Sequence, residues 1–104
     1  KAWHYHKIQS DSFAVIHGTM KVVLYDNRKG SPTKGEVNEF FMGEHNPILV
    51  RIPPMVYHGF KCISPDEAIM LNCPTEPYHR KKPDEYRLDA HTKKIPYDWT
   101  RKDG

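Results

Sequence analysis

Apolar and polar side chains alternate in short segments along the first 73 residues of the chain. In TMKVVLY, residues 19–25, Met20, Val22 and Leu24 occupy every second position. A period of two places such side chains on one face of a β-strand. The same reasoning, with Gly, Pro, Asn and Asp between the segments as turn signals, predicts strands over 12–17, 19–25, 36–42, 48–52, 56–62 and 67–73.

No segment longer than ten residues shows a strong helical period, which indicates an all-β fold. Several short strands with regular turns between them are typical of a sandwich or a barrel. Prolines and charged residues become frequent after Pro74. We therefore expect residues 1–104 to form one domain, with 74–104 as an irregular C-terminal arm laid over the strands. Because the chain starts at Lys1 in what reads as mid-strand, we also expect native N-terminal strands to be missing.

The charge of the chain is mild, at a formal net +3. The basic clusters 80–82 and 93–94 lie in the arm, where they predict a solvated face and no nucleic-acid partner. No apolar run is long enough for a membrane span, so no membrane association is expected. Two cysteines, Cys62 and Cys73, do not suggest a disulfide framework. Reduced thiols are typical of the cytoplasm, which is the predicted location.

The candidate chemistry lies in two stretches of the chain. The first carries His4 and His6, which alternation places on one face of a strand, and Asp11 five residues later. The second brings His58 after a Pro-Pro turn. Three imidazoles and one carboxylate would suit Fe, Mn, Ni or Zn. Alternatively, one neutral imidazole would act as a general base, or these are polar residues with no chemical role.

The spacing of these residues resembles the two cupin sequence motifs. His-x-His-x4-Asp-x6-Gly resembles the first motif, with Asp11 where cupins usually carry Glu. The segment PPMVYH, residues 53–58, resembles the second motif, with Met55 in the usual Gly position. This resemblance implies a small jelly-roll fold with the histidines inside it.

A more specific resemblance runs over nearly the whole chain. Five motifs, in order, resemble the dTDP-4-dehydrorhamnose 3,5-epimerase family, and the short relatives from spore-coat and surface-polysaccharide gene sets look closer than the true rhamnose enzymes. This implies a cupin-type jelly roll in which the N-terminal strands of the family are absent. The motifs are SPTKGEVNEFF (31–41), RIPPMVYHGFKC (51–62), LNCPTEPY (71–78), PDEYRLD (83–89) and IPYDW (95–99).

The resemblance implies an isomerase that transfers protons without a cofactor or metal. The family's substrate is a nucleotide-linked 4-keto-6-deoxy sugar, whose ketone acidifies the neighbouring C–H groups. A histidine removes one proton and a tyrosine on the other face of the ring returns one. By motif position the base is His4 and its carboxylate partner is Asp89. The position of the catalytic tyrosine is occupied by Asn72, whose amide cannot donate a proton as a phenol can.

Other positions imply contacts to the substrate. Lys1 stands where the family's arginine binds phosphate, although a lysine lacks the bidentate fork. His6 replaces a glutamine of the family. His58 and Phe60 match the pocket wall, and Tyr78 matches an aromatic residue near the nucleotide. The lysine with which the family stabilises the enolate has no counterpart here.

Three hypotheses follow from the sequence. The first is an isomerase of this family, acting in surface-polysaccharide biosynthesis. The second is a cupin that binds a divalent transition metal through His4, His6, Asp11 and His58. The third is a sugar-nucleotide-binding relative that has lost catalysis, because Asn72 replaces the tyrosine. In each case a short chain leaves apolar surface uncovered, so we expect a homodimer formed by strand exchange or sheet extension.

Overall fold

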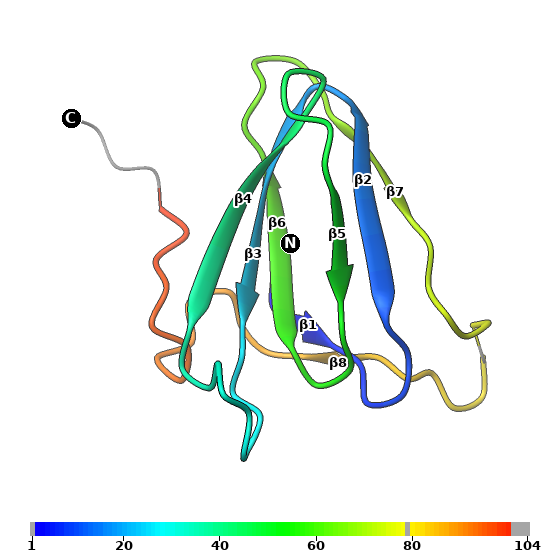
Figure 1. Ribbon diagram of the computed structural model, residues 1–104, viewed down its shortest axis with the longest axis vertical. Coiled ribbons are helices and arrows are strands. Elements are labelled where there is room, and N and C mark those ends of the chain that lie inside the picture. The colour runs from blue at the N-terminus through cyan, green and yellow to red at the C-terminus, as the bar shows by residue number, and fades with distance from the viewer. Residues whose placement is uncertain (1, 79, 101–104) are drawn as a thin grey trace.

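The computed structural model describes residues 2–78 and 80–100, and these residues form strands and no helix (Figure 1). Every strand pairing is antiparallel. In the same residues, nothing forms a helix long and apolar enough to cross a membrane. The strands are β1 (His4–Tyr5), β2 (Asp11–His17), β3 (Thr19–Tyr25), β4 (Val37–Gly43), β5 (Leu49–Ile52), β6 (Tyr57–Cys62), β7 (Ile69–Asn72) and β8 (Tyr86–Arg87).

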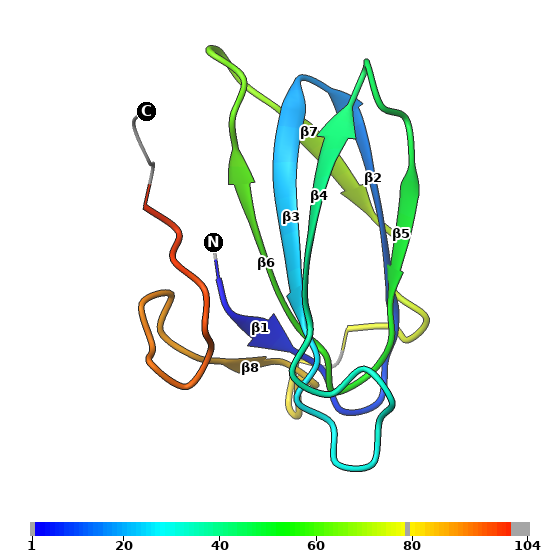
Figure 2. The same cartoon turned by 60° about the vertical axis from the view of Figure 1, so that its left-hand side comes forward.

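Two sheets face each other as a sandwich (Figure 2). One sheet has the order β4-β3-β6-β1-β8 and the other the order β5-β2-β7. The sheets do not close into a barrel, since each keeps two edge strands. The all-β prediction is confirmed as a sandwich, and the six predicted strands agree with β2 to β7 to within two residues at each end.

The main core lies between the sheets and follows from the alternation. Inward-facing side chains such as Phe13, Val22, Met42 and Ile52 are almost completely buried. Burying one large apolar side chain stabilises the fold by about 1.5–3 kcal/mol. These residues therefore fix the register of the strands that carry the site.

A second apolar cluster covers the outer face of β3. Val23 and Tyr25 point away from the main core, yet both are buried. Trp3 packs on this face together with Ile95 and Trp99 from the arm, and the two indole rings lie 5.2 Å apart. The arm therefore explains why residues 22 and 23 of one strand are both fully buried.

The C-terminal arm contains a β-strand, whereas an irregular segment was expected. Its residues Tyr86 and Arg87 form β8, which pairs with β1 at the edge of the five-stranded sheet. The pairing continues at Trp3 and Leu88, whose backbone groups exchange two hydrogen bonds of 2.9 Å. A strand forms here because β1 presents an open edge and the segment after Pro83 is extended.

Candidate active site

A cavity of about 800 Å³ opens between the two sheets and the beginning of the arm. Its volume is that of a typical small-molecule site. Seven predicted site residues line it, and they come from three separate regions of the sequence: His4, His6, Asp11, His58, Phe60, Asn72 and Tyr78. Asp89 does not line it among the described residues, and the prediction for Lys1 falls outside them.

A wider cleft of about 1300 Å³ lies elsewhere, between the arm and the strands β3 and β6. Two of its three lysines already have partners: Lys21 lies over the Tyr97 and Trp99 rings, and Lys61 donates to the Trp99 carbonyl. None of the predicted site residues lines it within the ranges 2–78 and 80–100. We therefore assign the site to the smaller cavity.

His4 is held on the cavity wall by strand pairing and by one carboxylate. It lies opposite His58 of β6 on one side and Arg87 of β8 on the other. Its Nδ1 donates to Glu85 Oε1 over 3.0 Å. Burial lowers the pKa of His4 and the contact with Glu85 opposes this only in part. A neutral ring with its proton on Nδ1 carries a lone pair on Nε2, which suits a general base.

The carboxylate beside His4 is therefore Glu85, where the family pattern implied Asp89. Asp89 instead accepts a hydrogen bond of 2.8 Å from the backbone N–H of His91, inside a turn. The physical reason is the pairing of β8 with β1: cross-strand partners share a face, and every second residue returns to it. Glu85 and Arg87 thus share the face of His4, while Asp89 lies in the turn that follows the last backbone pair, Trp3 with Leu88. Alternation in PDEYRLD puts residues 85, 87 and 89 on one face of a strand, so the pattern alone does not separate Glu85 from Asp89.

Glu85 is also bound to the neighbouring arginine. Arg87 Nη2 donates to the same oxygen, Oε1, over 3.1 Å. Burial would raise the pKa of Glu85, but the bonds from Arg87 and His4 outweigh it and lower the pKa. Glu85 is thus an anion near neutral pH, and it stabilises the imidazolium that forms when His4 takes a proton.

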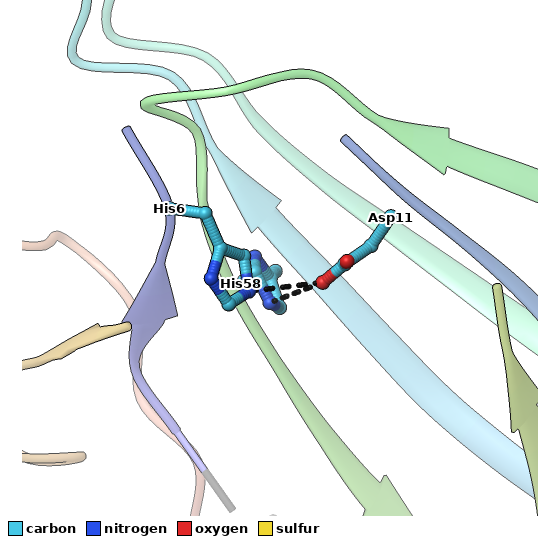
Figure 3. A group of neighbouring side chains, drawn as sticks. All are labelled: His6, Asp11 and His58. Atoms are coloured by element: carbon cyan, nitrogen blue, oxygen red, sulfur yellow. Dashed lines mark ion pairs between the residues drawn. The ribbon is translucent and has the colours of Figure 1, made fainter. Parts of the chain in front are cut away.

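A second group of side chains centres on Asp11 (Figure 3). Asp11 Oδ2 lies 3.0 Å from His6 Nε2 and 3.6 Å from His58 Nε2, and both Asp11 and His58 are buried. The contact with Asp11 raises the pKa of His6, whereas burial lowers the pKa of His58 to about 4. His58 is therefore neutral near pH 7. His4 does not belong to this group, so three of the four predicted metal ligands converge.

Asp84 fixes the loop between β1 and β2, and sequence reasoning missed it. Its carboxylate accepts hydrogen bonds of 2.8–3.0 Å from the backbone N–H groups of Lys7, Ile8 and Gln9. Burial would raise the pKa of Asp84, but these bonds lower it. A charged acceptor that satisfies three backbone donors holds the loop, and with it His6, against the cavity. The signal in the sequence is weak, since Pro-Asp also reads as an ordinary turn.

A family model for dTDP-4-dehydrorhamnose 3,5-epimerase matches residues 1–104. The chain belongs to this family. It is 43% identical over 100 residues to a probable low-salt glycan biosynthesis epimerase of Haloferax volcanii, covering 95% of this chain and 64% of the relative. It is 38% identical over 99 residues to a spore coat polysaccharide biosynthesis protein of Bacillus subtilis, covering 95% of this chain and 66% of the relative. The chain thus spans about two thirds of the length of these curated relatives.

Solved structures of the family share the fold. A dTDP sugar isomerase of Desulfovibrio desulfuricans superimposes with a TM-score of 0.91 at 36% identity, over 99% of this chain and 65% of that one. A dTDP-4-dehydrorhamnose 3,5-epimerase of Bacillus anthracis superimposes with a TM-score of 0.82 at 22% identity, over 99% and 59% of the two chains. Membership of this epimerase family therefore confirms the jelly-roll expectation.

The main difference from the epimerase family at this site concerns the position of the proton-returning tyrosine. Asn72 lies on β7 opposite Phe13 and lines the cavity, so an amide occupies the predicted position. Tyr57 contacts the Tyr5 ring edge-to-face and stacks with the Tyr25 ring, and it does not line the cavity. Among the described residues, Tyr78 is the one tyrosine in the cavity lining. Its side chain is 73% exposed, so it lies near the mouth.

Two cations at the cavity were not predicted. Arg87 and Lys82 both line it, and both belong to the arm. Lys82 was interpreted as part of a solvated basic face, because a run of three basic residues gives no indication of which one reaches a cavity. A guanidinium and an ammonium at a cavity mouth are suited to phosphate oxygens.

Proposed function

We propose that this protein is a sugar-nucleotide isomerase that abstracts a proton next to the ketone of a nucleotide-linked 4-keto-6-deoxy sugar, in surface-polysaccharide biosynthesis. The observation that carries the proposal is His4, a neutral imidazole on the cavity wall whose Nδ1–H is bound by Glu85 at 3.0 Å. The match to the epimerase family over residues 1–104 supports the same reaction class.

The proposed reaction needs two proton transfers. His4 Nε2 takes the proton from the carbon beside the ketone, the C–H electron pair moves into the enolate, and His4 becomes an imidazolium stabilised by Glu85. A proton donor on the other face of the sugar then protonates the same carbon and inverts it. Asn72 cannot donate this proton, so we assign the donor role to Tyr78 or to a water molecule. Positioned acids and bases each contribute about 10²–10⁴-fold to such rates.

We propose that this reaction uses no cofactor, because the ketone of the substrate itself makes the neighbouring proton acidic. Arg87 and Lys82 are the proposed partners of the diphosphate, together with Lys1. His58 and Phe60 form the proposed wall beside the sugar. The predicted cytoplasmic location is supported by Cys62 and Cys73, which are both exposed free thiols.

The test is incorporation of solvent deuterium into a 4-keto-6-deoxy sugar nucleotide. The wild-type protein should exchange a proton next to the ketone, and His4→Ala should lower the rate by at least about 100-fold. His17→Ala is the matched control, since His17 forms a 3.0 Å pair with Glu44 on the exposed surface. Exchange in His4→Ala at the wild-type rate would exclude His4 as the base.

Asn72 supports a second candidate function, a sugar-nucleotide-binding protein without catalysis. Such a protein keeps the cavity and its cations but has no tyrosine at the position where the family's acid lies. Binding measured by calorimetry together with an absence of deuterium exchange would favour this function. Binding accompanied by exchange would exclude it.

We also propose a homodimer formed by strand exchange or sheet extension. The three-stranded sheet has two edge strands, β5 and β7, and its outer face carries Leu49 and Leu71 on either side of Ala14. These two leucines are 70% and 54% exposed, which is typical of a surface that a partner covers. Light scattering at micromolar concentration should give twice the chain mass, and Leu71→Glu should shift the protein toward the monomer. A monomer in the wild type would contradict the proposal.

A further inference from the structure

Both ring nitrogens of His6 face hydrogen-bond acceptors. Its Nδ1 is hydrogen-bonded to the backbone carbonyl oxygen of Asp84, and its Nε2 lies 3.0 Å from Asp11 Oδ2. A carbonyl oxygen and an ionised carboxylate accept hydrogen bonds and have no proton to donate. A neutral imidazole carries one N–H, and an imidazolium carries two. The two contacts together therefore select the cationic form of His6.

Asp11 is the anion that completes this pair. Its other oxygen, Oδ1, accepts a hydrogen bond of 2.8 Å from Gln9 Nε2. Burial would raise the pKa of Asp11, but the bonds from His6 and Gln9 outweigh it and lower the pKa. The neighbouring His58 does not take the proton, because burial lowers its pKa and keeps its ring neutral. Near neutral pH the group thus consists of an Asp11 anion, a His6 cation and a neutral His58.

The cation is the member of this pair that faces the cavity. Both residues line the cavity, but the His6 side chain is 13% exposed and the Asp11 side chain only 2%. Asp11 therefore lies deeper than His6, and a molecule in the cavity meets the positive end of the pair. The proposed base, His4, lies on the same wall, since the rings of His4 and His6 both lie close to the His58 ring, with centroid separations of 6.3 and 5.3 Å.

The proposed isomerase reaction places negative charge next to this wall. When His4 takes a proton from the carbon beside the ketone, the C–H electron pair moves toward the ketone oxygen and an enolate forms. Arg87 and Lys82 also line the cavity, but both side chains are exposed, and water and salt screen exposed charges. A positive charge held in a partly buried site acts more strongly on a charge that develops during the reaction.

We propose that the His6 imidazolium, held by Asp84 and Asp11, supplies the positive charge that stabilises the enolate formed by His4. This role rests on the proposed isomerase function. His6 takes up and releases no proton in it: the proton leaves the carbon for His4 Nε2, and both N–H groups of His6 stay bound to their acceptors. His6 thus acts on the transition state through its charge, which a neutral side chain of similar size cannot replace.

The first measurement reads the charge of His6 without any substrate. In protein labelled with ¹⁵N at histidine, both ring nitrogens of His6 should show the NMR shifts of protonated nitrogens at about pH 7.5, where an ordinary histidine is mostly neutral. Loss of these signals in His6→Gln assigns them. In Asp11→Asn the ring should become neutral, because its charged acceptor is lost. A neutral His6 ring in the wild type would overturn the proposal.

The second measurement is the rate of solvent-deuterium exchange into a 4-keto-6-deoxy sugar nucleotide. His6→Gln keeps an N–H for Asp11 but removes the charge, and it should lower the rate at saturating substrate about 100-fold, the lower end of the range for losing one oxyanion donor. KM should change by less than about threefold, because the bound substrate does not yet carry the enolate charge. His6→Lys restores a cation and should exchange at least about tenfold faster than His6→Gln.

The control for both variants is His17→Gln, which removes a histidine–carboxylate pair with the same 3.0 Å separation but with both side chains half exposed. It should exchange like the wild type. Exchange in His6→Gln at the wild-type rate, or equal rates in His6→Gln and His6→Lys, would overturn the role of His6 and leave the proposed isomerase function standing. An absence of exchange in the wild type would instead contradict the isomerase function itself, and the role of His6 with it.

Discussion

The protein has two buried aspartates with different surroundings: Asp26 lies in the loop after β3, and Asp11 lies in the cavity. The first supports the structure of a loop, and the second belongs to the candidate active site. Asp26 accepts hydrogen bonds from Arg28 Nε, Arg28 Nη2, Ser31 Oγ and Thr33 Oγ1. Apart from the backbone N–H of Arg28, these donors come from side chains that hold their protons at neutral pH. Asp11 instead faces two imidazoles, which can lose or gain a proton.

A buried carboxylate can take part in proton chemistry only where its hydrogen-bond partners can themselves gain or lose a proton. The Asp26 loop has one arrangement of protons, so it can only hold the chain in place. The protons of the Asp11 group can be arranged in more than one way, because an imidazole titrates near neutral pH. The motif SPTKGEV, which carried part of the family resemblance, thus belongs to the rigid loop through Ser31 and Thr33.

The largest effect on stability is expected at Asp26. Asp26→Ala leaves the Arg28 guanidinium and two hydroxyl groups without their acceptor and should lower the free energy of unfolding by roughly 2–4 kcal/mol. Denaturation in urea at pH 7 measures this. The control Asp66→Ala changes an exposed carboxylate and should stay within about 0.5 kcal/mol of wild type.

The contribution of Asp26 should also depend on pH in a definite direction. The bonds from Arg28 lower the pKa of Asp26 far below its usual value of 3.8. A depressed acid pKa stabilises the fold above the unfolded pKa, and this stability is lost as the pH falls through the folded pKa. The difference between wild type and Asp26→Ala should therefore be constant above about pH 4.5 and shrink below it. A difference that grows on acidification would contradict this assignment.

A smaller loss of stability is expected for Asp11→Asn at pH 8. The histidines around Asp11 can become neutral, so the substitution leaves no uncompensated charge and should cost about 1–2 kcal/mol. The same urea measurement compares it directly with Asp26. A loss equal to that of Asp26→Ala would show that the Asp11 group is as rigid as the loop, and the contrast between the two regions would fail.

Substitutions of Glu85 and Asp89 separate the two candidate carboxylate partners of His4. Glu85→Gln keeps the size of the side chain but removes the charge that stabilises protonated His4, and it should lower the exchange rate about tenfold. Because Glu85 raises the pKa of His4, the variant should also need a lower pH to protonate its base, which moves the acid limb of the pH profile down. Asp89→Asn should leave the exchange rate and the pH profile unchanged. An effect of Asp89→Asn without an effect of Glu85→Gln would identify Asp89 as the partner of His4, as the family pattern implied.

The smallest effect is expected at Asn72. Asn72→Tyr places a phenol at the cross-strand partner position of Phe13 and should raise formation of the inverted sugar about three- to fivefold, below the roughly 10²-fold of a fully positioned acid. Deuterium exchange should rise less, because His4 already performs the first step. Tyr78→Phe in the wild type tests the rival donor. If the wild type inverts each carbon as fast as it exchanges its proton, a donor other than residue 72 is already in place.

The strands and seven of the residues that line the cavity could be predicted from the sequence. Alternation at residues 19–25, together with Gly and Pro turns, is a local property of the chain, so β2 to β7 could be predicted. His4, His6, Asp11 and His58 were predicted as one site because their residue types and spacing carry chemistry that can be read directly.

Tertiary structure alone decided which of these groups touch each other. The choice of Glu85 over Asp89 follows from the register of β8 on β1, a pairing between residues about 80 positions apart in sequence. The separation of His4 from the Asp11 group follows from which backbone carbonyls and carboxylates each ring meets. Hydrogen bonds act over about 3 Å, whereas a sequence pattern locates a side chain only on a face. Partners at that range are therefore fixed only when the sheets are packed together.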